Sequence, residues 1–88
     1  MFYVYIIFSE NIQRYYCGQT KDISFRFLQH NSAETVSNKH GIPWKMVGYI
    51  KVESRSEAMK LERQIKKRGI KRWVEEHKEE LIRDSLEK

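Results

Sequence analysis

Two tyrosines, an arginine and a histidine lie within the first 31 residues of this sequence, at spacings that allow them to share one surface. Tyr5 and Tyr16 stand in two apolar runs, and Arg26 and His30 stand four residues apart in the segment that follows. At about 100° per residue, a separation of four brings two side chains to the same side of a helix. Phenol, guanidinium and imidazole groups bind anions and transfer protons. This grouping makes the stretch a candidate functional site.

Arg26 and His30 fall on the inward stripe of the expected helix, where apolar residues would be usual. A polar side chain that is buried there needs a hydrogen-bond partner or a function. Each residue alone has a simpler explanation, because Arg26 can pair with Asp22 one turn back and His30 can close the helix end. The two tyrosines on the adjoining segments weaken that explanation, and both interpretations stay open at this point.

The first third of the chain predicts two strands and a short helix. Residues 2–8 are β-branched and aromatic throughout, which is typical of a strand buried on both faces, and residues 14–18 predict the returning strand. Asp22 can then cap a helix, and Ile23 and Phe27 follow the spacing of its inward face.

The register of the expected hairpin decides where the two phenols point. With residues 9–12 as the loop, Tyr5 lies opposite Tyr16 and Tyr3 lies opposite Gly18. All four then share one face of the sheet, because side chains alternate along a strand. A slip of one residue would turn Tyr16 to the other face.

The rest of the chain predicts one more strand and two helices. Residues 32–43 are polar and without pattern, which indicates a connecting loop, and residues 44–52 alternate as a strand does. An S-x-x-E capping box at Ser54 starts a helix that runs to about Arg68, with Gly69 as its stop.

A last helix is expected from residue 70 to about residue 83, and the residues after it should fray. The domain is therefore expected over residues 1–84, with 85–88 as a tail. The inward positions of this helix are Ile70, Trp73, Val74, His77 and Leu81.

Glu62 is the unusual residue of the helix before it. It falls within the apolar stripe formed by Ala58, Leu61 and Ile65, and an unpaired buried charge is costly. An ion pair with Lys66 one turn on is the simpler alternative to a functional role.

Size and composition exclude several classes of protein. The chain has 88 residues, a formal net charge of +5 and a lone cysteine, Cys17. This length makes one domain with a single modest core. One cysteine forms no intramolecular disulfide, and no zinc-site spacing is present. Without a signal peptide or a long apolar run, we expect a cytoplasmic protein that does not enter the membrane. The positive charge favours polyanionic partners.

The densest run of positive charge lies in residues 63–72. This stretch contains no acidic residue, and the next one is Glu75. Such a run is often a solvated face, and it could also hold phosphates. Its members are Arg63, Lys66, Lys67, Arg68, Lys71 and Arg72.

Four short motifs in this order resemble the GIY-YIG nuclease superfamily, and in particular its small single-domain bacterial members. They are Tyr3-Val4-Tyr5, Tyr16-Cys17-Gly18 with Thr20 after it, Arg26-x-x-x-His30-Asn31, and Ala58-x-x-x-Glu62. The resemblance covers the chain from Phe2 to about Arg83. It implies an α+β fold, with a three-stranded antiparallel sheet flanked by about three helices in the order β-β-α-β-α-α.

The resemblance also implies an activity, namely hydrolysis of phosphodiester bonds with one divalent ion, magnesium or manganese. The matching catalytic residues are Tyr5, Tyr16, Arg26 and His30, and Glu62 matches the metal-binding glutamate. Arg26 would hold two phosphate oxygens, while a tyrosine or His30 would activate water, and the choice among the three stays open. DNA is a more probable substrate than RNA, and related domains act in homing endonucleases, restriction enzymes and excision repair.

The sequence departs from the pattern of the superfamily at several positions. Tyr3 replaces the glycine that names the first motif, and Gln19 stands where some members carry a lysine, so Lys21 would have to supply that cation. Residues 32–40 lack the basic and threonine pattern of close relatives, and no counterpart is found for the asparagine that some members use after the glutamate.

Two other functions compete with the nuclease hypothesis. A non-catalytic nucleic-acid-binding module would use residues 63–72, and an interaction protein would expose Tyr3, Trp44 and Tyr49 as a binding patch. A domain this small also has no separate targeting module, so specificity would need a homodimer or a partner protein.

Overall fold

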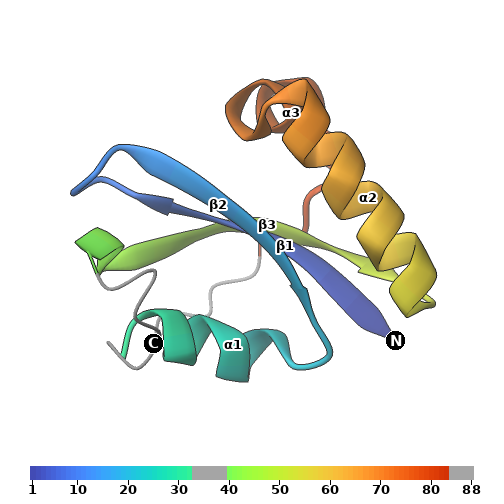
Figure 1. The fold of residues 1–88 in the computed structure, drawn as a ribbon, viewed down its shortest axis with the longest axis horizontal. Coiled ribbons are helices and arrows are strands. Elements are labelled where there is room, and N and C mark those ends of the chain that lie inside the picture. Colours follow the sequence, from blue (N-terminus) through green and yellow to red (C-terminus); the bar gives the residue numbers. More distant parts are fainter. Residues whose placement is uncertain (33–39, 84–88) are drawn as a thin grey trace.

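An antiparallel sheet forms the middle of the structure, with α1 against one face and α2 and α3 against the other (Figure 1). This computed structural model describes residues 1–32 and 40–83. The elements in chain order are β1 (Phe2–Ser9), β2 (Arg14–Thr20), α1 (Ile23–His30), β3 (Trp44–Val52), α2 (Arg55–Arg68), α3 (Ile70–Glu76) and the 3-10 turn η2 (Lys78–Glu80). The predicted α+β class and the order β-β-α-β-α-α are confirmed.

β1 is the central strand, since the order in the sheet is β2-β1-β3. Both of its faces are covered, and four successive residues of the strand are at most 1% exposed: Val4, Tyr5, Ile6 and Ile7. Burial on both faces explains why this segment has the continuous apolar composition that predicted it. It also leaves β2 and β3 as the two edges of the sheet.

Each face of the sheet has its own apolar cluster. On the α2 and α3 face, Val4, Ile6 and Cys17 pack with Ala58 and the residues Ile65, Trp73, Val74 and Leu81. On the α1 face, the cluster consists of Tyr5, Ile7, Phe27, Trp44 and Tyr49. None of the helices in residues 1–32 and 40–83 has the length and apolar character needed to cross a lipid bilayer.

The predicted register of the hairpin is wrong by two residues. Tyr5 lies opposite Gly18 and Tyr16 lies opposite Ile7, so Tyr5 does not face Tyr16 and Tyr3 does not face Gly18. The strands close at Ser9 and Arg14, which centres the turn one residue later than expected. A shift of two residues preserves the alternation of side chains, so both phenols still point to the α1 face.

Two sequence expectations for the later part of the chain are also corrected. α3 ends at Glu76 and not near Arg83, because the chain turns and Ile82 exchanges two backbone hydrogen bonds with Tyr49 on the open edge of β3, at 2.9 and 3.0 Å. Trp44 and Tyr49 are only 4% and 6% exposed, so they cannot form a protein-binding patch with Tyr3.

The start of α2 agrees with the sequence, whereas the connecting loop and the tail are largely not described. The capping box of α2 is confirmed, because the hydroxyl of Ser54 accepts a hydrogen bond from the backbone N–H of Glu57 at 3.2 Å. Most of the expected loop 32–43 lies outside the described residues, as does the tail 85–88. The domain limits 1–84 stay a prediction.

The first testable prediction concerns Gly18. A Cβ atom at this position would lie 2.5 Å from the hydroxyl oxygen of Tyr5 and 2.7 Å from its Cζ, and the Tyr5 side chain is only 1% exposed. Gly18→Ala should therefore lower the free energy of unfolding by about 1–3 kcal/mol, as overpacking of a core does. Urea denaturation measures this, and unchanged stability would contradict the contact.

Candidate active site

Tyr5, Arg26 and His30 form one hydrogen-bonded cluster between the sheet and α1. The Tyr5 hydroxyl lies 2.8 Å from Nε2 of His30, and it accepts a hydrogen bond from Nε of Arg26 at 3.3 Å. His30 is 1% exposed, and Arg26 is half-buried. The helical spacing of Arg26 and His30 thus places both side chains on the sheet-facing side of α1, as predicted.

Tyr16 completes the cluster from the edge strand β2. Its ring centroid lies 5.1 Å from that of His30 and 6.3 Å from that of Tyr5. Tyr16 is half-buried, whereas Tyr5 is 1% exposed. The four predicted catalytic side chains are therefore neighbours, and Tyr16 is the tyrosine nearer to the surface.

The local sequence explains how α1 presents these groups. The Asp22 carboxylate accepts a hydrogen bond from the backbone N–H of Phe25 at 3.0 Å and so caps the helix. The simpler explanation for Arg26 was an ion pair with this aspartate. Instead, Nη1 of Arg26 donates to the side-chain oxygen of Gln29 at 3.1 Å, and its Nε is turned toward Tyr5.

The hydrogen bonds determine where the protons lie. The Arg26 guanidinium is only a donor, so the Tyr5 oxygen accepts from it. The Tyr5 hydroxyl then donates its own proton to Nε2 of His30, since a buried hydroxyl proton without an acceptor is costly. His30 consequently carries its ring proton on Nδ1.

Burial holds Tyr5 and His30 in their neutral forms. Burial raises the pKa of Tyr5 to about 12, against the opposing effect of its hydrogen bond with Arg26. Burial, together with the smaller effect of the positive charge of Arg26, lowers the pKa of His30 to about 4. The hydrogen bond with Tyr5 is the main reason why the pKa of Arg26 is raised.

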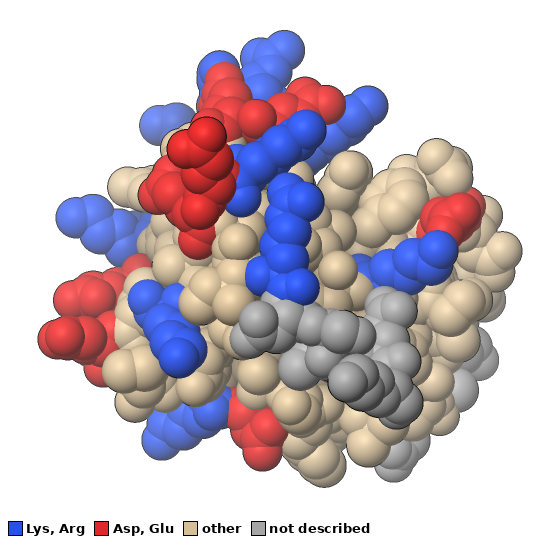
Figure 2. Space-filling view, turned by 180° about the vertical axis from the view of Figure 1, so that it is seen from behind, with Lys and Arg blue, Asp and Glu red and all other residues tan. Residues whose placement is uncertain are grey.

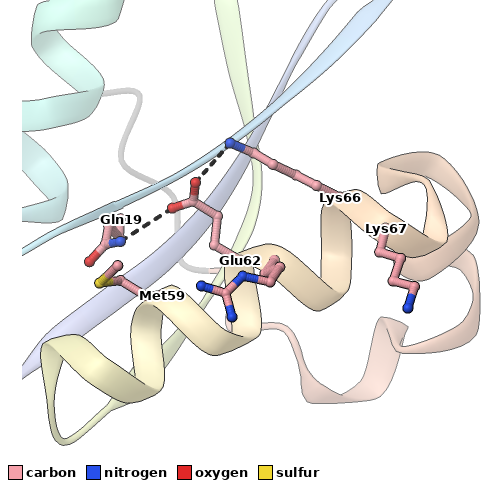
Figure 3. Close-up of a pocket in the computed structure, with 6 residues that line it drawn as sticks. Gln19, Met59, Glu62, Lys66 and Lys67 are labelled. Atoms are coloured by element: carbon pink, nitrogen blue, oxygen red, sulfur yellow. Dashed lines mark hydrogen bonds and ion pairs between the residues drawn. The ribbon is translucent and has the colours of Figure 1, made fainter.

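Glu62 approaches from α2, on the other side of the sheet (Figure 3). Its Oε2 accepts a hydrogen bond from Nζ of Lys66 at 2.7 Å, so the ion pair considered as the simpler alternative does form. Its Oε1 accepts a longer hydrogen bond from Nε2 of Gln19 on β2, at 3.5 Å. The Glu62 side chain is 21% exposed.

The edge strand β2 separates Glu62 from the other four residues. Tyr16 points to the α1 face. Gln19, three residues later on the same strand, points to the α2 face, because side chains alternate along a strand. Among the described residues, Glu62 makes no hydrogen bond with the tyrosine cluster.

The surroundings of Glu62 suit a hard divalent cation. The side-chain oxygen of Gln19 is buried and lacks a hydrogen-bond partner among the described residues, and it belongs to the residue that contacts Glu62. Carboxylate and amide oxygens are ligands of magnesium, which usually keeps several waters and uses one or two carboxylates. In residues 1–32 and 40–83, no three His, Cys, Asp or Glu side chains cluster as a zinc site would need.

The basic stretch 63–72 is less uniform than its sequence suggests. Arg63, Lys66 and Lys67 line the pocket at Glu62. Arg68 instead forms a bidentate ion pair with Glu76 of α3, so an acidic residue does offset this part of the run. The pairing joins positions eight apart across the α2–α3 turn, which the sequence pattern did not reveal.

The other predicted nucleic-acid-binding residues do not line the pocket at Glu62. Lys71 and Arg72 flank the start of α3 beside Glu75, and the Lys21 ammonium lies 5.4 Å from the centre of the Phe2 ring. Figure 2 shows the side turned away in Figure 1, where acidic and basic side chains intermingle and form no uniform basic surface.

Two residues were not assigned a site role from the sequence. Gln19 was noted only as a departure from the lysine of other members, yet it contacts Glu62. Gln29 orients the guanidinium of Arg26. Its position three residues after Arg26 on a helix was the available signal.

The lowered pKa of His30 predicts an acid-dependent loss of stability. In the unfolded chain histidine binds a proton below about pH 6.5, whereas folded His30 does so only near pH 4. Stability is thus fully present above pH 6.5 and falls as the pH drops toward 4, by about 2 kcal/mol between pH 7 and pH 4.5. Urea denaturation across this range measures the slope.

A matched pair of variants shows whether His30 causes this change of the free energy of unfolding with pH. His30→Gln should remove it, and His40→Gln, at an exposed position, should keep it. Glu10 and Glu76 have lowered pKa values, so their contributions are lost only below the ordinary pKa of glutamate and outside this window. A slope that survives in His30→Gln would contradict the assignment.

Comparison with known families agrees with the geometry. Residues 1–78 match the model of the GIY-YIG catalytic domain. No curated protein and no solved structure matches the chain. The match spans most of the chain and includes all four residues of the tyrosine cluster and Glu62. This chain therefore belongs to the GIY-YIG family, whose catalytic domain implies nuclease activity, generally with a divalent metal ion.

Proposed function

We propose that this chain is a metal-dependent endonuclease that hydrolyses phosphodiester bonds of DNA, in repair or recombination, with Tyr5, Tyr16, Arg26, His30 and Glu62 as its site. The observation that carries the proposal is the hydrogen bonding of the buried Tyr5 hydroxyl to both Arg26 and His30. Such an arrangement fixes a cation and two polar rings in place before any substrate arrives, which favours catalysis.

Arg26 is proposed to bind the phosphate that is cleaved. Its Nε and Nη1 are held by Tyr5 and Gln29, so the plane of the guanidinium is set. The remaining N–H groups can donate to phosphate oxygens and neutralise the charge that develops there. A lysine has no such planar fork, so Arg26→Lys would not replace it.

The two tyrosines are proposed to have different roles. Tyr5 is buried and keeps its proton at neutral pH. We therefore assign it to positioning Arg26 and His30 and not to acting as a base. Tyr16 is half-buried on the edge strand and lies beside His30. Tyr16 is therefore the tyrosine we assign to orienting the attacking water.

Glu62 and Gln19 would hold the metal ion, magnesium or manganese. A bound divalent cation supplies charge neutralisation to a phosphodiester under attack. The carboxylate of Glu62 and the unpaired oxygen of Gln19 are oxygen donors of the kind such an ion prefers.

Positive side chains beside this pocket are proposed to bind the DNA backbone. Arg63 and Lys67 line it and are exposed, and Lys66 points toward β2 (Figure 3). Lys21, Lys71 and Arg72 would extend the contact along the molecule. Specificity would then depend on a second copy or a partner protein, because phosphate contacts carry no sequence information.

A non-catalytic DNA-binding module is the second candidate. The observation that favours it is the ion pair of Glu62 with Lys66, which neutralises the proposed metal ligand. Binding without cleavage would distinguish it from the nuclease.

The central prediction concerns cleavage. Glu62→Ala and Arg26→Ala should each reduce magnesium-dependent nicking of supercoiled or branched DNA by at least about a hundredfold, since each removes a group that stabilises the transition state. Gel assays of nicking measure this, and circular dichroism verifies that both variants remain folded.

Glu79→Gln is the matched control, because this glutamate lies on the 3-10 turn after α3 and is exposed. It should cleave as the wild type does. If the wild type cuts no substrate, or if Glu62→Ala cuts as well as the wild type, the nuclease proposal is wrong.

A further prediction concerns DNA affinity. Arg63→Gln and Lys67→Gln together should weaken binding and reduce the slope of log affinity against log salt by about two, because each residue neutralises one phosphate. Lys51→Gln removes a positive charge from β3, at the opposite edge of the sheet, and should change neither. Fluorescence anisotropy in calcium measures both quantities, and equal effects of the two changes would exclude the assigned surface.

A further inference from the structure

Both carboxylate oxygens of Glu62 are already occupied in this structure. Lys66 donates to Oε2 at 2.7 Å and Gln19 donates to Oε1 at 3.5 Å (Figure 3). The contact with Lys66 is the shorter one and carries full charge. Any cation that binds Glu62 therefore competes with the ammonium of Lys66.

An ammonium and a divalent cation that both contact one carboxylate weaken each other's binding. Two positive charges a few ångströms apart repel, and water screens them poorly at a partly buried group. Glu62 is such a group, since 21% of its side chain is exposed. Lys66 has to leave Oε2 before a metal ion can use that oxygen.

Lys66 has a second place to go. It lies on the last turn of α2, its side chain reaches β2, and half of its surface is exposed, so its stem is free to rotate. A phosphate in the same pocket, beside Arg63 and Lys67, would offer its ammonium a new anion. Transfer of Lys66 from Glu62 to phosphate would leave the carboxylate available.

We propose that Lys66 is a positioning residue that couples the two ligands of this site: it occupies Glu62 while the site is empty and moves to a DNA phosphate when DNA binds, which opens Glu62 to the metal ion. This inference rests on the proposed nuclease function and goes beyond it. By linkage, DNA then raises metal affinity by the same factor by which metal raises DNA affinity.

Gln19 supports the exchange. Its amide nitrogen faces Glu62, while its oxygen is buried without a partner among the residues described. Rotation about the last side-chain torsion exchanges the two atoms. With its nitrogen toward Glu62, the Gln19 amide donates to a carboxylate that holds no metal ion. With its oxygen toward Glu62, the amide could instead contact a metal ion bound to that carboxylate. The unpaired oxygen gains a partner only in the second arrangement.

Lys67 provides a matched control for Lys66. It carries the same charge one residue further along α2 and lines the same pocket, but its side chain points away from Glu62 (Figure 3). A general effect of positive charge on metal affinity would appear in both variants, whereas direct competition for Glu62 would appear only at Lys66.

The test measures manganese binding to the folded proteins by electron paramagnetic resonance of free Mn²⁺, without DNA. Lys66→Gln should bind Mn²⁺ at least about fivefold more tightly than the wild type. Lys67→Gln should stay within about twofold, and Glu62→Gln should lose the site. Equal tightening by Lys66→Gln and Lys67→Gln, or no tightening by Lys66→Gln, would overturn the coupling.

A second arm adds a short DNA duplex to Arg26→Ala, which is deficient in cleavage under the proposed function. The duplex should raise the affinity for Mn²⁺, after correction for Mn²⁺ bound by DNA alone, and the additional change Lys66→Gln should abolish this increase. An increase that persists without Lys66 contradicts the coupling and leaves the metal role of Glu62 intact. Mn²⁺ binding that is the same in the wild type and Glu62→Gln refutes that metal role as well.

Discussion

The buried hydroxyl of Tyr5 is the point on which the arrangement of this site depends. It accepts from Arg26 and donates to His30, so one group from the central strand sets the orientation of two side chains from α1. Gly18 on the neighbouring strand leaves the space that the Tyr5 ring occupies. Because Tyr5 and His30 are buried, the hydrogen bond between them is shielded from water, and an unmatched donor or acceptor there would be costly. The same burial keeps Tyr5 and His30 neutral, so Arg26 is the cluster's positive charge.

The site has two halves, and the sheet is what joins them. β2 is an edge strand, so side chains from both of its faces reach the rim between α1 and α2. Tyr16 belongs to the half that we propose binds phosphate, and Gln19 belongs to the half that we propose binds the metal ion. A phosphate lying across this rim could contact both. The ion pair of Glu62 with Lys66 then becomes part of the mechanism, because it keeps the carboxylate neutralised until an anion arrives.

Local periodicity was sufficient to predict the half of the site on α1. The spacing of Arg26 and His30 and the cap at Asp22 are short-range features, and alternation along β2 kept Tyr16 on the correct face even though the register was wrong by two residues. The other half depended on long-range packing. That Glu62 faces β2 from the opposite side of the sheet follows from how α2 packs on it, which no local pattern contains. The early end of α3 has the same origin, since it follows from the pairing of Ile82 with β3.

In the proposed site, the two halves serve one metal ion and one phosphate. Paramagnetic broadening of backbone amide signals by Mn²⁺ in the presence of a short DNA duplex tests this claim most directly. We expect the signals of Gln19, Glu62 and Lys66 to broaden first, together with that of Tyr16 across the edge strand. The signal of Lys51 on the far edge should be unaffected. Broadening confined to other regions, or none near Glu62 at saturating metal, would contradict it.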